Sequence, residues 1–242
     1  MQTSSNSWAS THPTRTPGRL REAIEETGVC TCTGSYFQHN SRPYDVSEFR
    51  GFVLADDYAP IIFVNTRDSK SAQLFTLVHE FAHLLFNETG VDDLVYKIPE
   101  KEDLCDSVAA EVLVPAPIVY AVFDRQPADK AIETLRGVTK ASEIVCLRRA
   151  HELRCISRDK YFRIYADYKH RIEEADVSET PSGSGGGPSY YVLKKSTLGK
   201  LFSDSIYEGV KSERLLFSDA YRLTDMKASK FAEFYRQEGM YL

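Results

Sequence analysis

The sequence predicts an α+β fold, with a few short strands and a buried helix first and amphipathic helices after them. Stretches rich in β-branched and aromatic residues, which favour strands, fall before residue 65. A strongly apolar segment over residues 70–86 is too long for a strand and fits a helix. From residue 101 on, apolar residues recur with the helical period, apart from a Gly- and Ser-rich stretch at 178–189.

The first predicted domain spans residues 19–116 and follows a polar, Pro-rich lead-in, residues 1–18, that we expect to be disordered. A helix is predicted from Arg19 to a glycine stop at Gly28. Strands are predicted at residues 29–33, 49–54 and 60–64. The last of them is a short apolar run, PIIFV, which predicts a strand that is either buried or at the edge of a sheet.

Two further helices complete this predicted domain. The first is capped by Asp68 or Ser69 and ends near Asn87. Its apolar residues occupy nearly the whole circumference, which is typical of a buried helix, so the polar residues within it need a reason. The second helix runs from Lys101 to Leu113, and a proline two residues later marks its end.

The rest of the chain is predicted to be helical in two parts. Residues 117–177 form a domain in which a helix, a turn at Gly137 and a second helix from Ala141 resemble a helix-turn-helix arrangement. The stretch at 178–189 has the composition of a flexible linker. Residues 190–242 are predicted to form a small C-terminal region of two or three amphipathic helices.

Composition and charge point to a cytoplasmic protein. The chain has 242 residues, a formal net charge of −5 and a pI of about 5.7. This acidic balance gives no general attraction to nucleic acid or to an anionic membrane. No run approaches the roughly 20 apolar residues that span a bilayer, and the N-terminus lacks an apolar signal core. The five cysteines are an odd number, which favours reduced thiols over a disulfide framework.

The apolar helix contains the motif HEFAH, an instance of H-E-x-x-H formed by His79, Glu80 and His83. Residues four apart share one face of a helix, so both imidazoles can bind one zinc ion. Glu80 projects beside that ion, where its carboxylate can take a proton from a bound water. The alternative is a pair of core histidines satisfied by hydrogen bonds, with a surface glutamate between them. Three ionisable groups in an apolar helix favour the metal site, because burying them without a shared purpose is costly.

A catalytic zinc ion usually has a third protein ligand, and the helix at 101–113 offers Glu102 or Glu111. These two lie about 180° apart around a helix, so only one of them can face the metal. The face of Glu102 also carries small and apolar residues suited to packing, whereas we expect the face of Glu111 to be solvated. Glu102 is therefore the predicted ligand, with Asp106 accepting the free ring N–H of a ligand histidine. The alternative for Glu102 is a first-turn glutamate favoured by the helix dipole.

At these residues the sequence resembles the ImmA/IrrE family of metallo-endopeptidases. The matching text is FRGFVLADDYAPIIFVNTRDSKSAQLFTLVHEFAHLLF, followed by EDLCDSVAAEVLVP. The H-E-x-x-H residues match the first motif of the family, and Glu102 matches the glutamate that opens the second. Three positions differ from the usual residues of the family: Cys105 stands for Ala, Asp106 for Asn and Val108 for Phe.

The resemblance implies a zincin-like peptidase core, in which a small twisted sheet lies beside the motif helix, followed by a winged-helix-like part. It also implies zinc-dependent cleavage of a regulatory protein, a helix-turn-helix repressor or an antitoxin, in a bacterial or phage system. The alternative is a component of a toxin–antitoxin system that binds its partner without cleaving it. The intact Glu80 favours the enzyme, because a binding scaffold has no need of a general base.

We expect an extended peptide substrate to add as a strand along PIIFVN, in contact with Phe63, Val64 and Asn65. The alternative for Asn65 is a turn residue, since asparagine is common in turns. The residue that would stabilise the oxyanion cannot be identified from the sequence.

Two further patterns have ordinary explanations. Cys30 and Cys32 alternate along a predicted strand, so sharing one face explains them better than a metal site does. Basic residues of the helix-turn-helix-like segment could contact nucleic acid, but in an acidic chain packing or partner recognition is the better interpretation. These residues are Lys140, Arg148, Arg149 and Arg154. We expect neither direct nucleic-acid binding nor membrane association.

Overall fold

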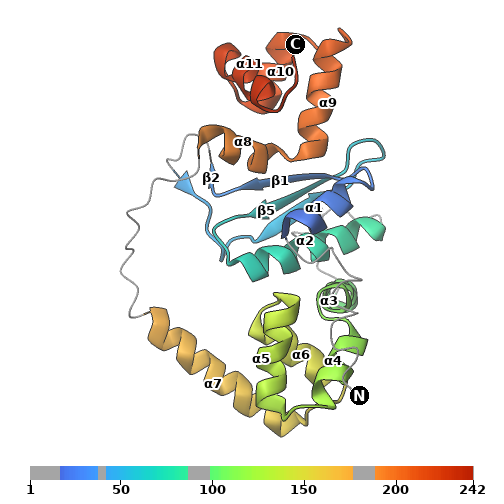
Figure 1. The fold of residues 1–242 in the computed structure, drawn as a ribbon, viewed down its shortest axis with the longest axis vertical. Coiled ribbons are helices and arrows are strands. Elements are labelled where there is room, and N and C mark those ends of the chain that lie inside the picture. The colour runs from blue at the N-terminus through green and yellow to red at the C-terminus, as the bar shows by residue number, and fades with distance from the viewer. Residues whose placement is uncertain (1–16, 38–41, 87–98, 177–188, 242) are drawn as a thin grey trace, which may run out of the picture.

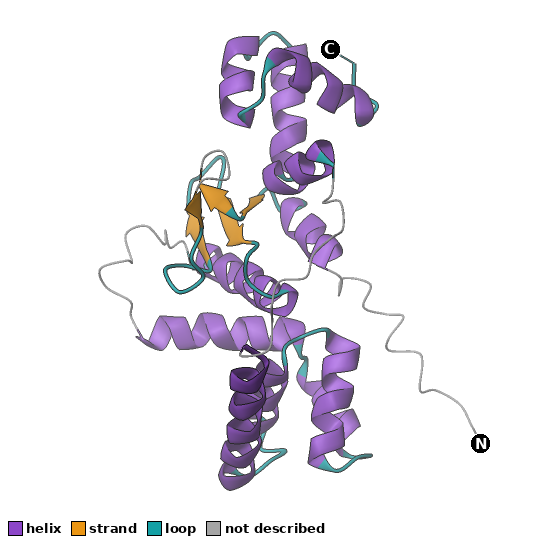
Figure 2. Ribbon diagram, turned by 90° about the vertical axis from the view of Figure 1, so that its left-hand side faces the viewer, coloured by secondary structure: helices purple, strands orange, loops and turns teal. Residues whose placement is uncertain are grey.

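The computed structural model describes residues 17–37, 42–86, 99–176 and 189–241. The predicted lead-in and the predicted linker lie almost wholly outside these ranges. In Figure 1, helices α8–α11 lie at one end of the long axis, a small sheet with α1 and α2 lies in the middle, and α4–α7 lie at the other end. Figure 2 shows the strands as one small group among the helices, so the fold is mixed α and β, as predicted.

A three-stranded sheet, in the order β1-β5-β4, forms the middle of the molecule. β1 (Cys30–Gly34) runs parallel to β5 (Ile61–Asn65), and β4 (Gly51–Leu54) runs antiparallel to β5. β5 is therefore the central strand, with a neighbour on each side. A separate antiparallel pair, which the sequence did not predict, is formed by β2 (Tyr36–Phe37) and β3 (Arg42–Pro43).

The two faces of the sheet differ because side chains alternate along each strand. One face packs against α1 (Pro17–Glu25) and α2 (Lys70–Leu85) through aliphatic side chains. The buried members of this cluster are Ile24, Val29, Val53, Ile62, Val64 and Leu77. The other face carries aromatic rings, including Phe52 stacked on Phe63 with ring centroids 5.1 Å apart. The sheet thereby holds α2 in place from one side.

α2 carries the H-E-x-x-H motif. Ser69 caps this helix by accepting a hydrogen bond from the backbone N–H of Ala72, at 3.2 Å. Its buried side chains contact the sheet on one side and α3 (Pro99–Leu113) on another. The prediction of burial around the whole circumference is wrong at the end of the helix, where Leu85 is 64% exposed.

Helices follow α3 to the end of the described range at residue 176. They are α4 (Ala116–Phe123), α5 (Ala128–Thr139), α6 (Glu143–Glu152) and α7 (Arg158–Asp176). Their apolar side chains form one core with those of α2 and α3. The described residues between 99 and 176 contain no strand, so the helix pair α5–α6 is present without a wing.

The turn between α5 and α6 lies later than predicted. Gly137 is inside α5, and a Cβ added there would meet nothing within 4 Å. The chain turns at Lys140, whose φ of 61° is left-handed. Ser142 then caps α6 by accepting a hydrogen bond from the backbone N–H of Val145, at 3.2 Å. The prediction of a turn at Gly137 was wrong. Left-handed backbone is usually expected at glycine, so the sequence did not indicate that the turn lies at a lysine.

Four helices, which we call the C-terminal bundle, end the described chain: α8 (Tyr190–Leu198), α9 (Lys200–Lys211), α10 (Phe217–Thr224) and α11 (Ala228–Gln237). They share a core of their own, built mainly on Ile206, Tyr207, Val210, Phe231, Phe234 and Tyr235. The sequence predicted only two or three helices here. Two breaks fall beside Glu213 and Asp225, which adopt positive φ values of 58° and 49° without being glycine.

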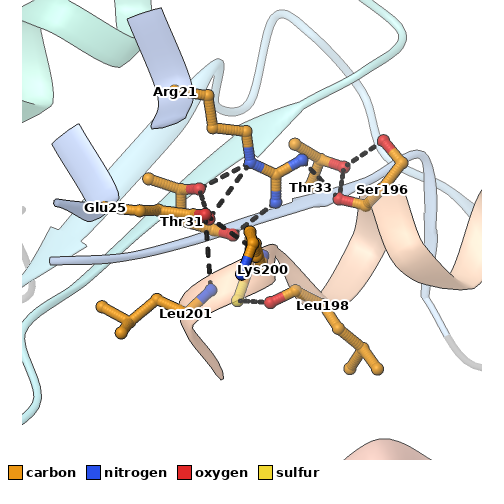
Figure 3. A network of polar contacts seen from close by, with 9 residues as sticks. Arg21, Glu25, Thr31, Thr33, Ser196, Leu198, Lys200 and Leu201 are labelled. Atoms are coloured by element: carbon orange, nitrogen blue, oxygen red, sulfur yellow. Dashed lines mark hydrogen bonds and ion pairs between the residues drawn. The ribbon is translucent and has the colours of Figure 1, made fainter. Parts of the chain in front are cut away.

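α8 and the start of α9 lie along the outer edge of β1, as Figure 3 shows. The guanidinium of Arg21 donates a hydrogen bond to the carbonyl oxygen of Ser196 on α8, at 2.6 Å. The hydroxyl of Thr33 on β1 donates to the same oxygen, at 2.8 Å. α8 therefore covers the edge of β1 that faces away from β5.

Glu25 of α1 fastens the next helix of the bundle (Figure 3). Its carboxylate accepts hydrogen bonds from the backbone N–H groups of Lys200 and Leu201, at 3.2 and 3.4 Å. A side chain from another element thus caps the N-terminus of α9. Gly199, with φ of 76°, permits this contact, because a Cβ there would lie 2.2 Å from the carbonyl oxygen of Thr31.

Within the described ranges, no single helix is long and apolar enough to cross a bilayer. Only α3 and α4 taken together reach the necessary length and apolarity, and the two are bent by 60°. Both helices contribute apolar side chains to the core shared with α2.

Candidate metal centre

α2 and α3 bring the predicted site residues together. On α3, Cys105 and Ala109 are fully buried, as the predicted packing face requires. Glu102 lies near the start of the same helix and reaches the histidines of α2. Glu111 points elsewhere: its side chain is 51% exposed and pairs with Arg149 of α6. Of the two candidate glutamates, the structure therefore places Glu102 at the histidine pair.

Two imidazole nitrogens and the two oxygens of one carboxylate converge between the two helices. Nε2 of His79 and Nε2 of His83 are 3.1 Å apart. Oε2 of Glu102 lies 3.4 Å from Nε2 of His79, and Oε1 lies 3.7 Å from Nε2 of His83. The three side chains are only 14%, 9% and 25% exposed, in the order His79, His83 and Glu102. They therefore form one compact and largely buried group.

The spacing of these atoms suits a zinc ion. Bonds of ~2.0–2.1 Å in a tetrahedral arrangement place two ligand atoms about 3.3 Å apart. The two nitrogens, 3.1 Å apart, and the contact of Oε2 with Nε2 of His79, at 3.4 Å, lie within a few tenths of an ångström of that value, and Oε1 of the same carboxylate is 3.7 Å from Nε2 of His83. Two imidazole nitrogens and one carboxylate oxygen also match a known donor set of catalytic zinc, which keeps a fourth position open. The group fits a metal better than a pair of core histidines satisfied by hydrogen bonds.

Asp106 lies behind His79, as the sequence predicted. Its Oδ1 is 3.0 Å from Nδ1 of His79, and its Oδ2 is 3.6 Å from Nη1 of Arg148 on α6. Burial has the largest single effect on the pKa of His79 and lowers it. The hydrogen bond to Asp106 and the charges of three nearby carboxylates outweigh burial, so the pKa is raised. The carboxylates thus favour positive charge at His79.

Glu80 lies beside the beginning of β4. A Cβ added to Gly51 would lie 3.5 Å from Cγ of Glu80 and 2.4 Å from Cγ2 of Thr76. Only a glycine lets this strand approach α2 so closely. The sequence prediction missed Gly51, although an isolated glycine in a strand-like run such as GFVL is a sign of close backbone approach.

The prediction that a substrate adds as a strand along β5 is wrong. That strand is bounded by β1 on one side and β4 on the other, so it has no free edge. Val64 is 4% exposed, and Phe63 stacks on Phe52. Among the strands that the structure describes, β4 pairs only with β5 in the three-stranded sheet and is therefore an edge strand. β4 also lies next to Glu80. The edge beside the site therefore belongs to β4.

Asn65 has the turn role that was the alternative prediction. Its side chain is fully buried at the end of β5. The amide group donates to the carbonyl oxygen of Phe49 at 3.1 Å, and the amide oxygen accepts from the backbone N–H of Arg67 at 3.0 Å. These contacts hold the turn that leads into α2, and they leave the side chain no direct path to a substrate.

The other candidate residues do not form a second metal group. In the part of the chain that the structure describes, His79, His83 and Glu102 are the one set of three or more ligand side chains close enough to hold a metal. Arg148 and Arg149 form ion pairs with carboxylates of α3. Two of the four basic residues considered for nucleic-acid contact therefore already pair with acidic groups of the protein. No local pattern predicts that Arg148 approaches Asp106, because the two residues are far apart along the chain.

Comparison with family models gives two matches. Residues 37–151 match Peptidase_M78, the IrrE N-terminal-like domain. This range contains β4, β5 and all of the site residues on α2, α3 and α6. Residues 198–237 match DUF8813, a domain of unknown function, which corresponds to most of the C-terminal bundle. No curated protein matches the chain.

Proposed function

Because residues 37–151 belong to the ImmA/IrrE family of metallopeptidases, we propose that this protein is a zinc-dependent endopeptidase that cleaves a regulatory protein. The family match supports a peptidase of the metal-dependent class. The observation that carries the more specific proposal is the convergence of Nε2 of His79, Nε2 of His83 and the carboxylate of Glu102. A general base, Glu80, follows directly on the first of these ligands.

His79, His83 and Glu102 would hold the ion. A bound zinc ion supplies two effects: it lowers the pKa of a water molecule, and it polarises the carbonyl group of the scissile peptide bond. Asp106 fixes the ring of His79 through Nδ1, so that Nε2 faces the other two ligands. This second contact supports the assignment of Nε2 as the ligand atom.

Glu80 would act as the general base and then the general acid. Its carboxylate accepts a proton from the attacking water and passes it to the nitrogen of the leaving amine. Gly51 keeps the backbone of β4 next to Glu80, because any larger residue would push the strand away from α2. The proton acceptor and a strand edge are therefore neighbours in this fold.

An extended peptide would bind along β4. Backbone groups at a strand edge can pair with an added strand, which gives affinity for many sequences through main-chain hydrogen bonds. β1, the other outer strand, is covered by α8. β4 is thus the better edge for a substrate. A helix-turn-helix repressor or an antitoxin is the class of partner that we propose, on the basis of family membership.

The test compares Glu80→Gln with Glu238→Gln in cleavage of the product of the neighbouring gene, with zinc present. Glu238 lies in the C-terminal bundle, paired with Lys195, so this control makes the same chemical change away from the site. We expect Glu80→Gln to slow cleavage by at least 100-fold and the control to cleave normally. A stable complex that neither the wild type nor the control cleaves would instead support the protein that binds its partner without cutting it.

A further inference from the structure

A cavity lies on the other side of α2 from the candidate metal centre. It has a volume of about 300 Å³ and is lined by parts of α1, β1, β5, α2 and α8. Leu77 lines this cavity, whereas His79 faces α3. At 100° per residue, these two positions are about 200° apart around the helix, so the cavity and the metal centre use opposite faces of α2. The cavity therefore does not belong to the peptidase site.

Three apolar side chains of α2 and β5 form part of the cavity wall. Val64, Leu74 and Leu77 line it, and the three side chains are 4%, 4% and 6% exposed. The size is at the lower end of the range for small-molecule sites, which are mostly apolar with a few polar groups that orient the ligand. The cavity also lies near the carboxyl ends of the parallel strands β1 and β5, where open sheets commonly bind ligands. These features suit a small molecule with an apolar body.

The charge of the cavity wall specifies the polar end of that molecule. Arg21 and Lys70 line the cavity, and no aspartate or glutamate is among the described residues that line it. Arg21 already pairs with Glu25, at 3.6 Å. Lys70 contacts a neutral group, the side-chain oxygen of Gln73, at 3.3 Å. In a chain with a net charge of −5, Lys70 thus provides a local positive charge beside an apolar wall.

We propose that this cavity binds a small amphipathic carboxylate, such as a medium-chain fatty acid. The carboxylate pairs with the ammonium group of Lys70, and the hydrocarbon chain lies against Leu74 and Leu77. Ser196 of α8 lines the cavity on the side of the C-terminal bundle. A bound ligand therefore contacts the peptidase domain and the bundle at once. This proposal does not depend on the metal centre.

Octanoate is a suitable probe, with octanol as the uncharged analogue, in calorimetric titration of the full-length protein. We expect octanoate to bind to a single saturable site and octanol to bind at least tenfold more weakly. Lys70→Met removes the charge and keeps an apolar stem, so it should weaken octanoate binding about tenfold, as expected for a lost charge-assisted hydrogen bond. Ser196→Phe should block the cavity and abolish binding of both probes.

Two control variants make the same changes elsewhere. Lys130→Met lies on an exposed position of α5, and Ser205→Phe lies on an exposed position of α9. Both should bind octanoate as the wild type does, and thermal unfolding should show that all four variants are folded. The proposal is overturned if octanoate does not bind saturably, if octanol binds equally well, or if Lys70→Met binds octanoate with unchanged affinity.

Discussion

Arg148 of α6 and Asp106 of α3 form an ion pair at 3.6 Å, directly behind the predicted metal ligand His79. Asp106 stands at a position where the resemblance to the family predicts asparagine. The carboxylate carries a charge that an amide lacks, and Arg148 provides a positive partner on its outer side. α6 thereby contacts the candidate metal centre through the carboxylate of Asp106.

Asp106→Ala should weaken zinc binding by about 10- to 100-fold, because a ring that loses its outer partner is less well oriented and less basic. Asp106→Asn should cost less, since the amide oxygen still accepts the Nδ1 proton. Competition with a coloured chelator at fixed pH measures both affinities. Asp103→Ala makes the same change at an exposed position of α3, so it serves as the control and should leave zinc affinity unchanged. Equal zinc affinities of Asp106→Ala and the wild type would show that Asp106 does not support zinc binding.

A matched pair of glutamate variants tests the choice of third ligand. Glu102→Ala removes an oxygen ligand and should reduce bound zinc well below one equivalent after dialysis. Glu111→Ala, on the opposite face of α3, should retain the ion, although the loss of its pair with Arg149 removes a surface contact. Elemental analysis of the two dialysed proteins is the measurement. Retention of zinc by Glu102→Ala together with its loss from Glu111→Ala would reverse the assignment.

The candidate metal centre was predictable from sequence because its spacing is a local property of two helices. His79 and His83 are one helical turn apart, and Glu102 and Asp106 are one turn apart, so each pair had to share a face. The helix periods also separated Glu102 from Glu111. What the sequence could not give is how the two helices meet other elements, which depends on packing between residues distant along the chain.

The errors occurred where such packing decides the outcome. PIIFVN has the apolar character of either a central strand or an edge strand, and only the pairing with both β1 and β4 distinguishes them. The contact of Glu25 with the start of α9 joins positions 175 residues apart, and no local sequence pattern predicts it. Lys140 turns the chain in a conformation that usually belongs to glycine, so the turn was placed at the nearby Gly137 instead.

Glu25→Gln should weaken the attachment of the C-terminal bundle. The amide keeps one acceptor for the α9 backbone but removes the charge that balances Arg21, so we expect a loss of ~1–3 kcal/mol in the free energy of unfolding. Hydrogen exchange should show faster exchange at the amides of Lys200 and Leu201. Glu238→Gln, within the bundle, should leave these two amides as protected as they are in the wild type. Unchanged protection in Glu25→Gln would mean that this carboxylate does not hold α9.

Cys32 should remain a thiol well above neutral pH. Burial is the main cause that raises its pKa, from 9.0 to about 11. The folded state therefore keeps a proton that the unfolded state loses above pH 9.0, so this group contributes a fall in stability as the pH rises from 9.0 to about 11. Urea titrations of the wild type and Cys32→Ala across this range measure the effect, and the variant should lose less stability. Equal losses in both proteins would contradict the raised pKa.

Gly51→Ala tests whether β4 must lie as close to α2 as the structure shows. The new Cβ would lie 2.4 Å from Cγ2 of Thr76 and 2.7 Å from the carbonyl oxygen of Phe63. The second of these is a backbone atom and cannot rotate away, so the strand has to move, at a cost of ~1–3 kcal/mol in the free energy of unfolding. Cleavage should fall more than zinc affinity, since the strand edge shifts beside Glu80 while the ligands on α2 and α3 stay in place.

Gly137→Ala is the matched control: it adds a methyl group inside α5 where nothing lies within 4 Å, and it should stabilise the protein by ~0.5–1 kcal/mol. A Gly51→Ala protein as stable and as active as the wild type would show that β4 does not need this close approach.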